Sequence, residues 1–347
     1  ARGARSPEGE HGEPHTDTTR AWGHQNDSQG RLTTVTQGPR VRTTGYFNTA
    51  DPRKGYVQSV TNALSQTTAF EPDALGRILQ QIDPDAAQTS FTWDGSSNLS
   101  SVTPPGQPAH GQGFTPVDLL SSYTPPVVPG VPAPATLYAY NVDRQLTQTT
   151  RPDGLLIGRT YDPAGKLDLL TTPTGNVDYD YFGLTPCPGC APGRLQKITD
   201  PSGVVLDMSY DGTLLKSLTW SGAVSGGVGF SYDASFRVIG ETVTAGGTSS
   251  PMVFGYDNDD ITICASPTTC SPAGTDALKI SLNAGNGLVT GTVLDGVSDA
   301  LTYNAFGELA SYTAKIGATG VFSEVVDTPT NPRDKLGRIV QRVETNG

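Results

Sequence analysis

The sequence lacks the features that would place it in a membrane, on nucleic acid or among helical proteins. It contains no run of about 18 consecutive apolar residues, which excludes a membrane-spanning helix. Charged residues make up only 16% of the 347 residues and the net charge is −11, so a basic face for nucleic acid or an anionic membrane is missing. No window carries the long apolar stripe of an amphipathic helix. We therefore expect no nucleic-acid partner, no membrane span and no helical domain.

Residues suited to acid–base or metal chemistry are also scarce. The histidines are His11, His15, His24 and His110. They belong to a polar leading stretch and to a proline-rich stretch, so we expect none on a rigid scaffold where an acid–base group would be held. Asp83 and Asp85 fit a turn that ends a strand, and residues 257–260 lack the closing Glu of a calcium-binding loop. We predict no catalytic residue, no cofactor and no metal site.

Glycine and proline, by contrast, are abundant. The 41 glycines and 27 prolines together approach a fifth of the chain, and apolar residues make up 35%. Such a composition is typical of turn-rich β structure. A sheet with one face partly in contact with water needs less apolar material than a compact core does. The composition therefore favours a curved sheet or shell.

A short phrase recurs along the chain: an aromatic residue, Asp or Asn, two spacers, Gly or a substitute, a polar residue and an aliphatic one. It is clearest at Tyr161-Asp162-Pro163-Ala164-Gly165-Lys166-Leu167 and returns at Tyr303-Asn304-Ala305-Phe306-Gly307-Glu308-Leu309. The Asp or Asn of successive units stands at Asp27, Asp51, Asp73, Asp94, Asn141, Asp162, Asp180, Asp211, Asp233, Asp257, Asn283, Asn304 and Asp334. The underlying period is about 21 to 22 residues, which indicates a repeat array with insertions.

One unit shows how the phrase builds structure. In Asp162-Pro163-Ala164-Gly165, Asp suits the start of a type I turn, Pro presets the next φ angle and Gly accepts the closing geometry. The flanking residues alternate with a period of two, which indicates half-buried strands. Each unit is therefore predicted to be a β-hairpin that adds edge to edge to the next. The predicted fold class is all-β: about 12 to 13 hairpins, or about 26 strands, in one long curved or spiralling antiparallel sheet.

These residues resemble the Rhs or YD-repeat family. Four copies of the phrase carry its Gly-Arg-aliphatic ending: Gly30-Arg31-Leu32, Gly76-Arg77-Ile78, Gly193-Arg194-Leu195 and Gly337-Arg338-Ile339. The resemblance extends from Trp22 to the end of the chain. The family includes bacterial Rhs polymorphic-toxin shells, the shell component of insecticidal toxin complexes and the YD shell of teneurins. The resemblance implies a spiral ribbon of strands that closes into a hollow cocoon around a cargo.

The chain departs from the family pattern in one respect. Rhs shells often end in a core segment whose paired aspartates cut the chain and release a C-terminal toxin. Asp200-Pro201-Ser202-Gly203 resembles one fragment of that signature but lies among ordinary units, so we assign Asp200 no protease role. No such core stands near Gly347. We therefore expect either a piece of a longer polypeptide or a shell that is left open.

The repeats divide the chain into four segments. Residues 1–21 are polar and aperiodic, so we expect a flexible N-terminal lead. Repeat units fill residues 22–102. Residues 103–136 hold nine prolines and interrupt the phrase; because proline does not fit a central ladder position, we expect a proline-rich loop inserted within the shell. Units resume over residues 137–347, with loop insertions that contain cysteine.

The cysteines form two local pairs, both in the longer spacings. Cys187 and Cys190 have two residues between them, and Cys264 and Cys270 have five. A loop that projects from a sheet has no core of its own, so a disulfide is a suitable clip in an oxidising compartment. We predict structural disulfides 187–190 and 264–270. Cross-links between the two loops, free thiols, a zinc site and a redox pair remain as alternatives.

The repeat and the resemblance together predict a non-enzymatic, structural role. The first hypothesis is a shell segment of a secreted Rhs/YD-repeat protein that encapsulates or displays a cargo such as a C-terminal toxin. The second is an extracellular adhesion or self-assembling surface or matrix protein built from the same repeats. The third is a polysaccharide-acting enzyme, which needs two carboxylates on adjacent strands facing a groove. We expect a bacterial protein that is secreted, extracellular or at the cell surface.

The ends of such a ribbon are its predicted partner surfaces. A row of hairpins leaves an unpaired strand edge at each end, and natural sheets do not leave such edges long and bare. We therefore predict that further shell chain, another copy of this chain or an enclosed cargo covers them.

Overall fold

The computed structural model describes residues 22–48, 50–130, 134–183, 191–257, 260–265, 276–329 and 332–347. Within these residues the chain forms 28 β-strands and no helix, and all the strands belong to one sheet. The predicted all-β class and the single long sheet are confirmed. The first fourteen strands are β1 (Trp22–Asn26), β2 (Leu32–Gln37), β3 (Arg40–Tyr46), β4 (Val57–Thr61), β5 (Thr67–Pro72), β6 (Ile78–Ile82), β7 (Gln88–Trp93), β8 (Leu99–Thr103), β9 (His110–Phe114), β10 (Leu120–Thr124), β11 (Thr136–Tyr140), β12 (Leu146–Thr150), β13 (Leu156–Tyr161) and β14 (Leu167–Thr172). The others are β15 (Gly175–Tyr181), β16 (Leu195–Thr199), β17 (Val205–Asp211), β18 (Leu214–Ser221), β19 (Gly226–Tyr232), β20 (Val238–Ala245), β21 (Thr248–Asp257), β22 (Asp260–Cys264), β23 (Ala277–Leu282), β24 (Val289–Leu294), β25 (Val297–Tyr303), β26 (Leu309–Ile316), β27 (Thr319–Val325) and β28 (Val343–Asn346).

The strands follow one another in the sheet in the order of the sequence. Each strand pairs antiparallel with the strand before it and the strand after it. Two rims result. Turns that lead from an odd to an even strand lie on one rim, which we call the aspartate rim because it carries the Asp of the repeat phrase. Turns that lead from an even to an odd strand lie on the other, which we call the return rim.

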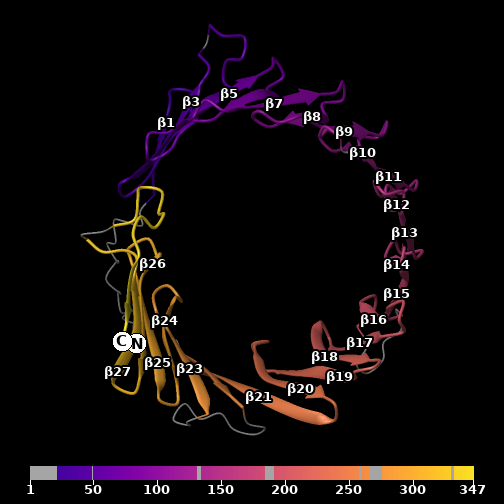
Figure 1. Ribbon diagram of the computed structural model, residues 1–347, viewed down its shortest axis with the longest axis vertical. Helices are drawn as coiled ribbons and strands as arrows, with labels where there is room; N and C mark the ends of the chain where they lie inside the picture. The colour runs from indigo at the N-terminus through magenta and orange to yellow at the C-terminus, as the bar shows by residue number, and fades with distance from the viewer. Residues whose placement is uncertain are drawn as a thin grey trace, which may run out of the picture.

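The ribbon of strands is bent into a ring (Figure 1). Most hairpins of the aspartate rim contain a β-bulge beside the turn, as between Thr160 and Tyr161 or between Thr302 and Tyr303. Pairs joined at the return rim have none, apart from β26 with β27. A bulge bends its strand and increases the local twist. Because the bulges recur along one rim, their bends add up and return the ribbon to its start, where Arg40 of β3 contacts Glu308.

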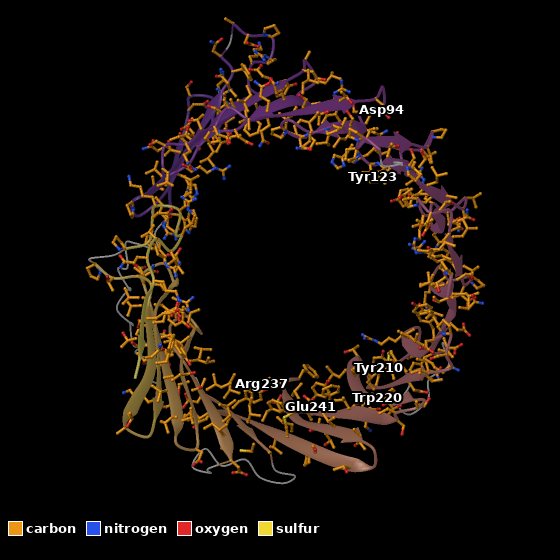
Figure 2. The ribbon with its side chains drawn as sticks, viewed as in Figure 1. Asp94, Tyr123, Tyr210, Trp220, Arg237 and Glu241 are labelled. Atoms are coloured by element: carbon orange, nitrogen blue, oxygen red, sulfur yellow. The ribbon has the colours of Figure 1, made fainter. Side chains whose placement is uncertain are left out.

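The ring has almost no packed core. Its accessible surface is 21912 Å², whereas a compact protein of the same 36.3 kDa exposes about 13,000 Å². The buried apolar residues among those described are Phe47, Ala191, Tyr210, Cys264, Ala277 and Val326. Side chains line both the inner and the outer side of the ring and leave its centre open (Figure 2). Cohesion therefore comes from strand ladders and from contacts between turns, not from a filled interior.

Residues 103–136, predicted to be an inserted loop, contribute two strands to the sheet. β9 and β10 pair with each other and lie between β8 and β11. Pro104 and Pro116 stand in turns, where no ladder donor is needed. Thr115 takes the place of the Asp, and its Oγ1 accepts a hydrogen bond from the backbone N–H of Leu119 at 3.1 Å. The loop prediction is wrong for residues 110–124. These residues form a repeat unit whose turn begins with Thr instead of Asp or Asn, so the repeat phrase does not reveal it.

Two of the predicted unit markers are misplaced. The rim turn after β3 begins at Phe47, whose N–H donates to the carbonyl of Tyr56 at 3.0 Å, and the turn after β15 begins at Phe182. Asp51 lies inside the longer first turn, and Asp180 lies in β15 opposite Lys197. An aromatic residue replaces the Asp in both turns, so the nearest Asp in the sequence marks the wrong position.

Candidate functional site

Nine turns of the aspartate rim, within the part of the chain that the structure describes, share one five-residue geometry. They are residues 27–31, 73–77, 94–98, 115–119, 141–145, 162–166, 233–237, 304–308 and 334–338. The N–H of the first residue donates to the carbonyl of the fifth, and the N–H of the fourth donates to the carbonyl of the first. In one of them, Asp73 Oδ1 accepts from the N–H of Leu75 at 2.8 Å and of Arg77 at 3.0 Å, and Oδ2 accepts from Arg77 Nε at 2.7 Å. The carboxylate thus holds the whole turn.

These hydrogen bonds favour the charged form of the carboxyl group. The pKa of Asp27, Asp94 and Asp233 is lowered below 3.8, first of all by the backbone N–H of the residue four positions on. In the longer turn after β3, the side chain of Arg53 lowers the pKa of Asp51 to about 2. These four aspartates therefore act as ionised turn anchors.

The fourth residue of each turn has a left-handed backbone. Gly165 has a φ of 80°, as the type I turn followed by a bulge requires, and the predicted role of this glycine is confirmed. Other units place a residue with a side chain there, such as Arg144 at 62° and Phe236 at 63°. These positions cost conformational energy that glycine avoids.

An Arg or Lys at the fifth position of the turn connects its unit to the next one in several repeats. The guanidinium of Arg31 lies 4.4 Å from the ring centroid of Tyr46, and Arg237 lies 4.4 Å from that of Tyr256. In the unit of Asp162, Lys166 lies 4.6 Å from the ring of the next tyrosine. A cation over an aromatic face is attractive. Arg31 and Arg237 therefore bind the Asp of their own turn on one side and the aromatic residue of the following unit on the other.

The aromatic residue itself fastens its strand to the strand before it. Its hydroxyl or indole N–H donates to the carbonyl of the aliphatic residue that closes the previous phrase, at 2.7–3.0 Å. The pairs are Tyr46 with Leu32, Trp93 with Ile78, Tyr140 with Leu120, Tyr161 with Leu146, Tyr181 with Leu167, Tyr210 with Leu195, Tyr232 with Leu215, Tyr256 with Val238 and Tyr303 with Val289.

These bonds replace missing rungs of the backbone ladder. The ladder between β12 and β13 runs from Gln148 opposite Gly158 to Thr150 opposite Leu156 and stops short of Leu146. The Tyr161 hydroxyl reaches the Leu146 carbonyl at 2.8 Å. A half-buried carbonyl without a partner is costly, so the hydroxyl satisfies it where the strands separate beside the bulge.

The Asp and the fourth residue of the repeat phrase thus shape their own turn, whereas the aromatic residue and several of the cations contact a neighbouring unit. A family model described as the teneurin YD-shell matches residues 22–339. The chain belongs to the teneurin YD-shell family. This confirms the resemblance to YD-repeat proteins and assigns the chain a structural shell role. No curated protein matches this chain in sequence.

Solved structures support the YD-shell fold. The crystal structure titled TcdB2-TccC3-TEV is 13% identical, with a TM-score of 0.73 over 93% of this chain and 18% of that one. The crystal structure titled TcdB2-TccC3 without hypervariable C-terminal region is 14% identical, with a TM-score of 0.58 over 91% of this chain and 20% of that one. At this identity the similarity concerns the fold alone. The chain spans about a fifth of the length of these two structures.

Of the four cysteines proposed to form disulfides, the structure describes one. Cys264 ends β22, lies opposite Ala277 of β23 and is 2% exposed. It is not a free thiol. Cys187, Cys190 and Cys270 lie outside the described residues, so the two predicted pairings stay predictions.

Two histidines lie on the YD-shell sheet, where none was expected. His24 belongs to β1 and His110 to β9. His110 Nδ1 is 2.7 Å from the hydroxyl of Tyr123, and the two rings stack with centroids 6.0 Å apart. The expectation failed because the sequence places His110 in a proline-rich stretch that the fold uses as strands.

The carboxylates examined in the sequence lie in turns. Asp200 begins a return-rim turn and accepts from the N–H groups of Ser202 and Val204 at 2.8 and 2.9 Å. Its pKa is lowered, chiefly by the side chain of Ser202. Asp83 and Asp85 stand in the turn between β6 and β7. Among the described residues no group of three or more His, Cys, Asp or Glu is placed to hold a metal ion.

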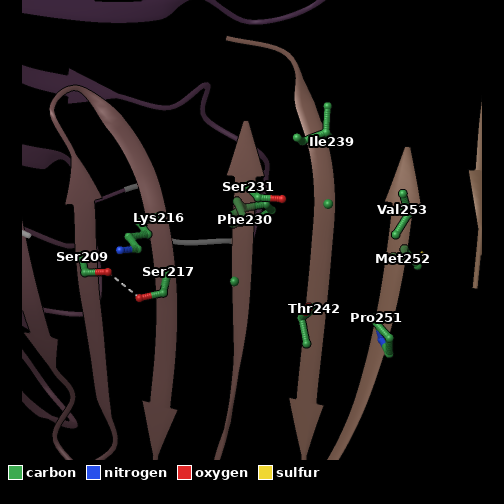
Figure 3. A pocket seen from close by; sticks show the side chains of 12 residues that line it. Ser209, Lys216, Ser217, Phe230, Ser231, Ile239, Thr242, Pro251, Met252 and Val253 are labelled. Carbon is green, nitrogen blue, oxygen red and sulfur yellow. Dashed lines mark hydrogen bonds between the residues drawn. The ribbon is translucent and has the colours of Figure 1, made fainter. Parts of the chain in front are cut away.

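One face of the shell carries a shallow trough over β17–β21 (Figure 3). Its volume is about 490 Å³, and it exists because Gly229 and Gly240 present no side chains between flanking strands. Ser209 and Ser217 are joined at its border by a hydrogen bond of 2.5 Å. Lys216 is the ionisable residue of the lining. A pair of carboxylates, which glycoside hydrolysis requires, is therefore not assembled in this trough.

No helix in the described part of the chain is long and apolar enough to cross a membrane. Both ends of the sheet keep an unpaired edge: β1 pairs with β2 alone and β28 with β27 alone, among the described strands.

Sequence reasoning missed the hydrogen bonds and cation–π contacts between units. The signal was present, because an aromatic residue precedes the Asp, and Gly-Arg-aliphatic follows it, in unit after unit. The contact of Arg40 with Glu308, two residues 268 positions apart, has no comparable signal in the local pattern.

Proposed function

We propose that this YD-shell chain is a non-catalytic wall segment of a secreted protein and that the wall encloses or displays a polypeptide cargo such as a toxin. The observation that carries the proposal is the single-layer ring with an open centre (Figure 2). A sheet that exposes 21912 Å² instead of filling its own interior leaves room for another chain. A bacterial origin and an extracellular or cell-surface location accord with such a wall.

The unpaired edges of β1 and β28 support the proposed partners. Exposed strand edges pair readily with other strands. We propose that further YD-shell chain or a second copy continues the sheet there and that the cargo contacts the inner side of the wall. Disulfides 187–190 and 264–270 are proposed to clip the cysteine loops.

The test is to purify the native particle and to determine the length of its chain and its contents by mass spectrometry and electron microscopy. A wall segment predicts density inside the shell and a co-purifying polypeptide that resists protease until the shell is unfolded. An empty shell with every co-purifying polypeptide open to protease would contradict encapsulation.

A second candidate is adhesion or self-assembly at a cell surface or in a matrix. It is favoured by the family match, since the model that fits residues 22–339 is that of the teneurin YD-shell. Fluorescently labelled native protein should then decorate cells or form filaments under the microscope, and these outcomes separate it from encapsulation. Activity on polysaccharides is the weakest candidate and is tested by detection of newly formed reducing ends.

A further inference from the structure

The two ends of the ribbon meet at a seam formed by side chains. Arg40 stands at the return-rim end of β3, and its Nη1 and Nη2 donate to the two carboxylate oxygens of Glu308 at 2.9 and 2.8 Å. Glu308 belongs to the aspartate-rim turn between β25 and β26. In Figure 1 the indigo first strands lie beside the yellow last segment. Within the described residues no strand pairing crosses this seam, because β1–β3 pair only among themselves and with β4.

The turn at the seam departs from the other eight five-residue turns at two positions. The fifth residues of the nine turns are Arg31, Arg77, Asn98, Leu119, Gln145, Lys166, Arg237, Glu308 and Arg338. The third residues are Gln29, Leu75, Ser96, Val117, Asp143, Ala164, Ser235, Phe306 and Leu336. Among the described turns, Glu308 is the one acid at the fifth position and Phe306 is the one aromatic residue at the third position. Both contact Arg40, whose guanidinium carbon lies 3.9 Å from the Phe306 ring centroid.

A third departure stands in the last unit. Arg333 precedes Asp334, at the position that an aromatic residue holds in six of the nine turns. Its Nη2 donates to the carbonyl of Leu309 at 2.7 Å, which is the bond that a tyrosine hydroxyl makes in other units. Its Nε lies 3.8 Å from carboxylate oxygens of both Glu308 and Asp327. Arg333 therefore makes the hydrogen bond that an aromatic side chain makes in other units, and it also places a positive charge next to Glu308.

The four charges at the seam balance and are shielded from water. Arg333 and Asp327 are each 12% exposed, Arg40 is 20% and Glu308 is 26% exposed. Asn304 Nδ2 donates to Glu308 at 2.9 Å and to Asp327 at 2.5 Å, which joins the two acids within one network. Partly buried, hydrogen-bonded pairs of this kind are worth more than exposed pairs.

We propose that Arg40, Glu308, Asp327 and Arg333 form an ionic latch that holds the ribbon closed and can release it while the sheet stays folded. Elsewhere around the ring neighbouring strands are held by backbone ladders, whereas the seam is held by side chains, so it is the place where the ring separates first. A groove of about 330 Å³, lined by Trp22, Val41 and Leu336 among others, lies beside the latch and adds modest apolar contact. The proposal goes beyond the shell role and does not depend on a cargo.

The test compares the wild-type chain with Arg40→Gln, Glu308→Gln and the double variant. Glu308→Gln suits this purpose because Gln145 already occupies the same position in another turn, where Asn141 Nδ2 donates to its Oε1 at 2.8 Å. The turn should therefore survive the loss of charge. Small-angle X-ray scattering measures the maximum dimension of the ring, and amide hydrogen exchange measures the protection of residues 38–42. Far-UV circular dichroism monitors the sheet.

The latch predicts that each single variant has a larger maximum dimension and about tenfold faster exchange at residues 38–42, with unchanged dichroism. The double variant should open no further than the single variants, because the two residues act as one pair. Arg237→Gln is the matched control: it removes the same kind of cation–π contact, from Tyr256, far from the seam. Wild-type dimensions in Arg40→Gln, additive effects in the double variant, or equal opening by Arg237→Gln would overturn the proposal.

Discussion

At the scale of single residues, the five-residue turn makes its strictest demand at the fourth position, where the backbone is left-handed. Glycine adopts that conformation without a steric penalty, whereas residues with a Cβ do not. The chain meets the demand in two ways, with Gly76 at a φ of 85° and Phe236 at 63°. Substitutions at these two residues therefore have opposite expected effects on stability.

Gly76→Ala should destabilise the shell. An alanine Cβ would lie 2.7 Å from Cε1 of Tyr56, and the positive φ adds strain. We expect a loss of about 1–3 kcal/mol in the free energy of unfolding. Chemical denaturation followed by fluorescence provides the measurement. Gly95→Ala is the control, since a Cβ there meets no atom within 4 Å; equal losses in both variants would contradict the explanation.

Phe236→Gly should stabilise the shell by about 1 kcal/mol, because it relieves left-handed strain and the larger freedom of glycine in the unfolded chain offsets only part of the gain. The Phe236 side chain is 72% exposed, so little packing is lost. The midpoint of thermal unfolding should rise. A lower midpoint would show that the Phe236 side chain makes a contact whose loss outweighs the relief of strain.

At the scale of elements, each hairpin is fastened to the previous one by the aromatic residue of its phrase. This bond falls where the bulge separates the strands and the ladder stops, so it maintains the sheet where backbone pairing is weakest. The cation of the preceding phrase lies over the same ring in several units. Two strands that are joined by a turn at the return rim are therefore also joined at the aspartate rim.

Tyr161→Phe tests this bond. The substitution removes the hydroxyl that donates to Leu146 O at 2.8 Å and leaves that carbonyl without its partner. We expect a loss of about 1–2 kcal/mol in the free energy of unfolding and faster amide exchange in β12 and β13. Tyr179→Phe is the control, since its hydroxyl makes no such bond among the described residues. If both variants unfold at the wild-type midpoint, the bond contributes nothing.

The elements also show how far sequence reasoning reached. The turn of Asp162 to Gly165 and the strands beside it were predicted, because turn chemistry and a period of two are local properties. The unit of Thr115 was missed, because threonine offers the same acceptor oxygen as Asp without belonging to the phrase. The units that begin at Phe47 and Phe182 were misplaced for a similar reason. The backbone requires a hydrogen-bonding geometry, and more than one residue type can supply or replace it.

At the scale of the whole molecule, a ring without a core depends on many small polar contacts. Numerous rim carboxylates share the same dependence on ionisation, so their contributions change together as the solution is acidified. The most shielded ion-paired charges among the described residues, Arg333 and Asp327, lie at the seam, where the ends of the ribbon meet. Acid is therefore a perturbation that acts on the entire structure.

Acidification should leave the shell stable down to about pH 4 and destabilise it below that. The pKa of Asp27, Asp94 and Asp233 is lowered from 3.8, and that of Asp51 to about 2. Arg40 likewise lowers the pKa of Glu308 from 4.5. A carboxyl group with a lowered folded-state pKa stabilises above its unfolded value and loses that contribution as pH falls through the folded value.

Thermal unfolding measured from neutral pH down to about pH 2 checks this expectation. The midpoint should stay level above about pH 5 and fall steeply between 3.8 and about 2. A fall centred near pH 6 would point to histidine instead and would contradict the assignment.

The sequence by itself determined the hairpin unit, its turn chemistry, the single-sheet class and the family, because each depends on residues close together in the chain. The tertiary structure alone decided that the ribbon bends into a ring and that its ends meet through Arg40 and Glu308. The physical reason is that the ring closes only because the small bends of all the strands add up to a full turn. A small change in bend per strand would shift the meeting point by many residues, and no local pattern encodes such a sum.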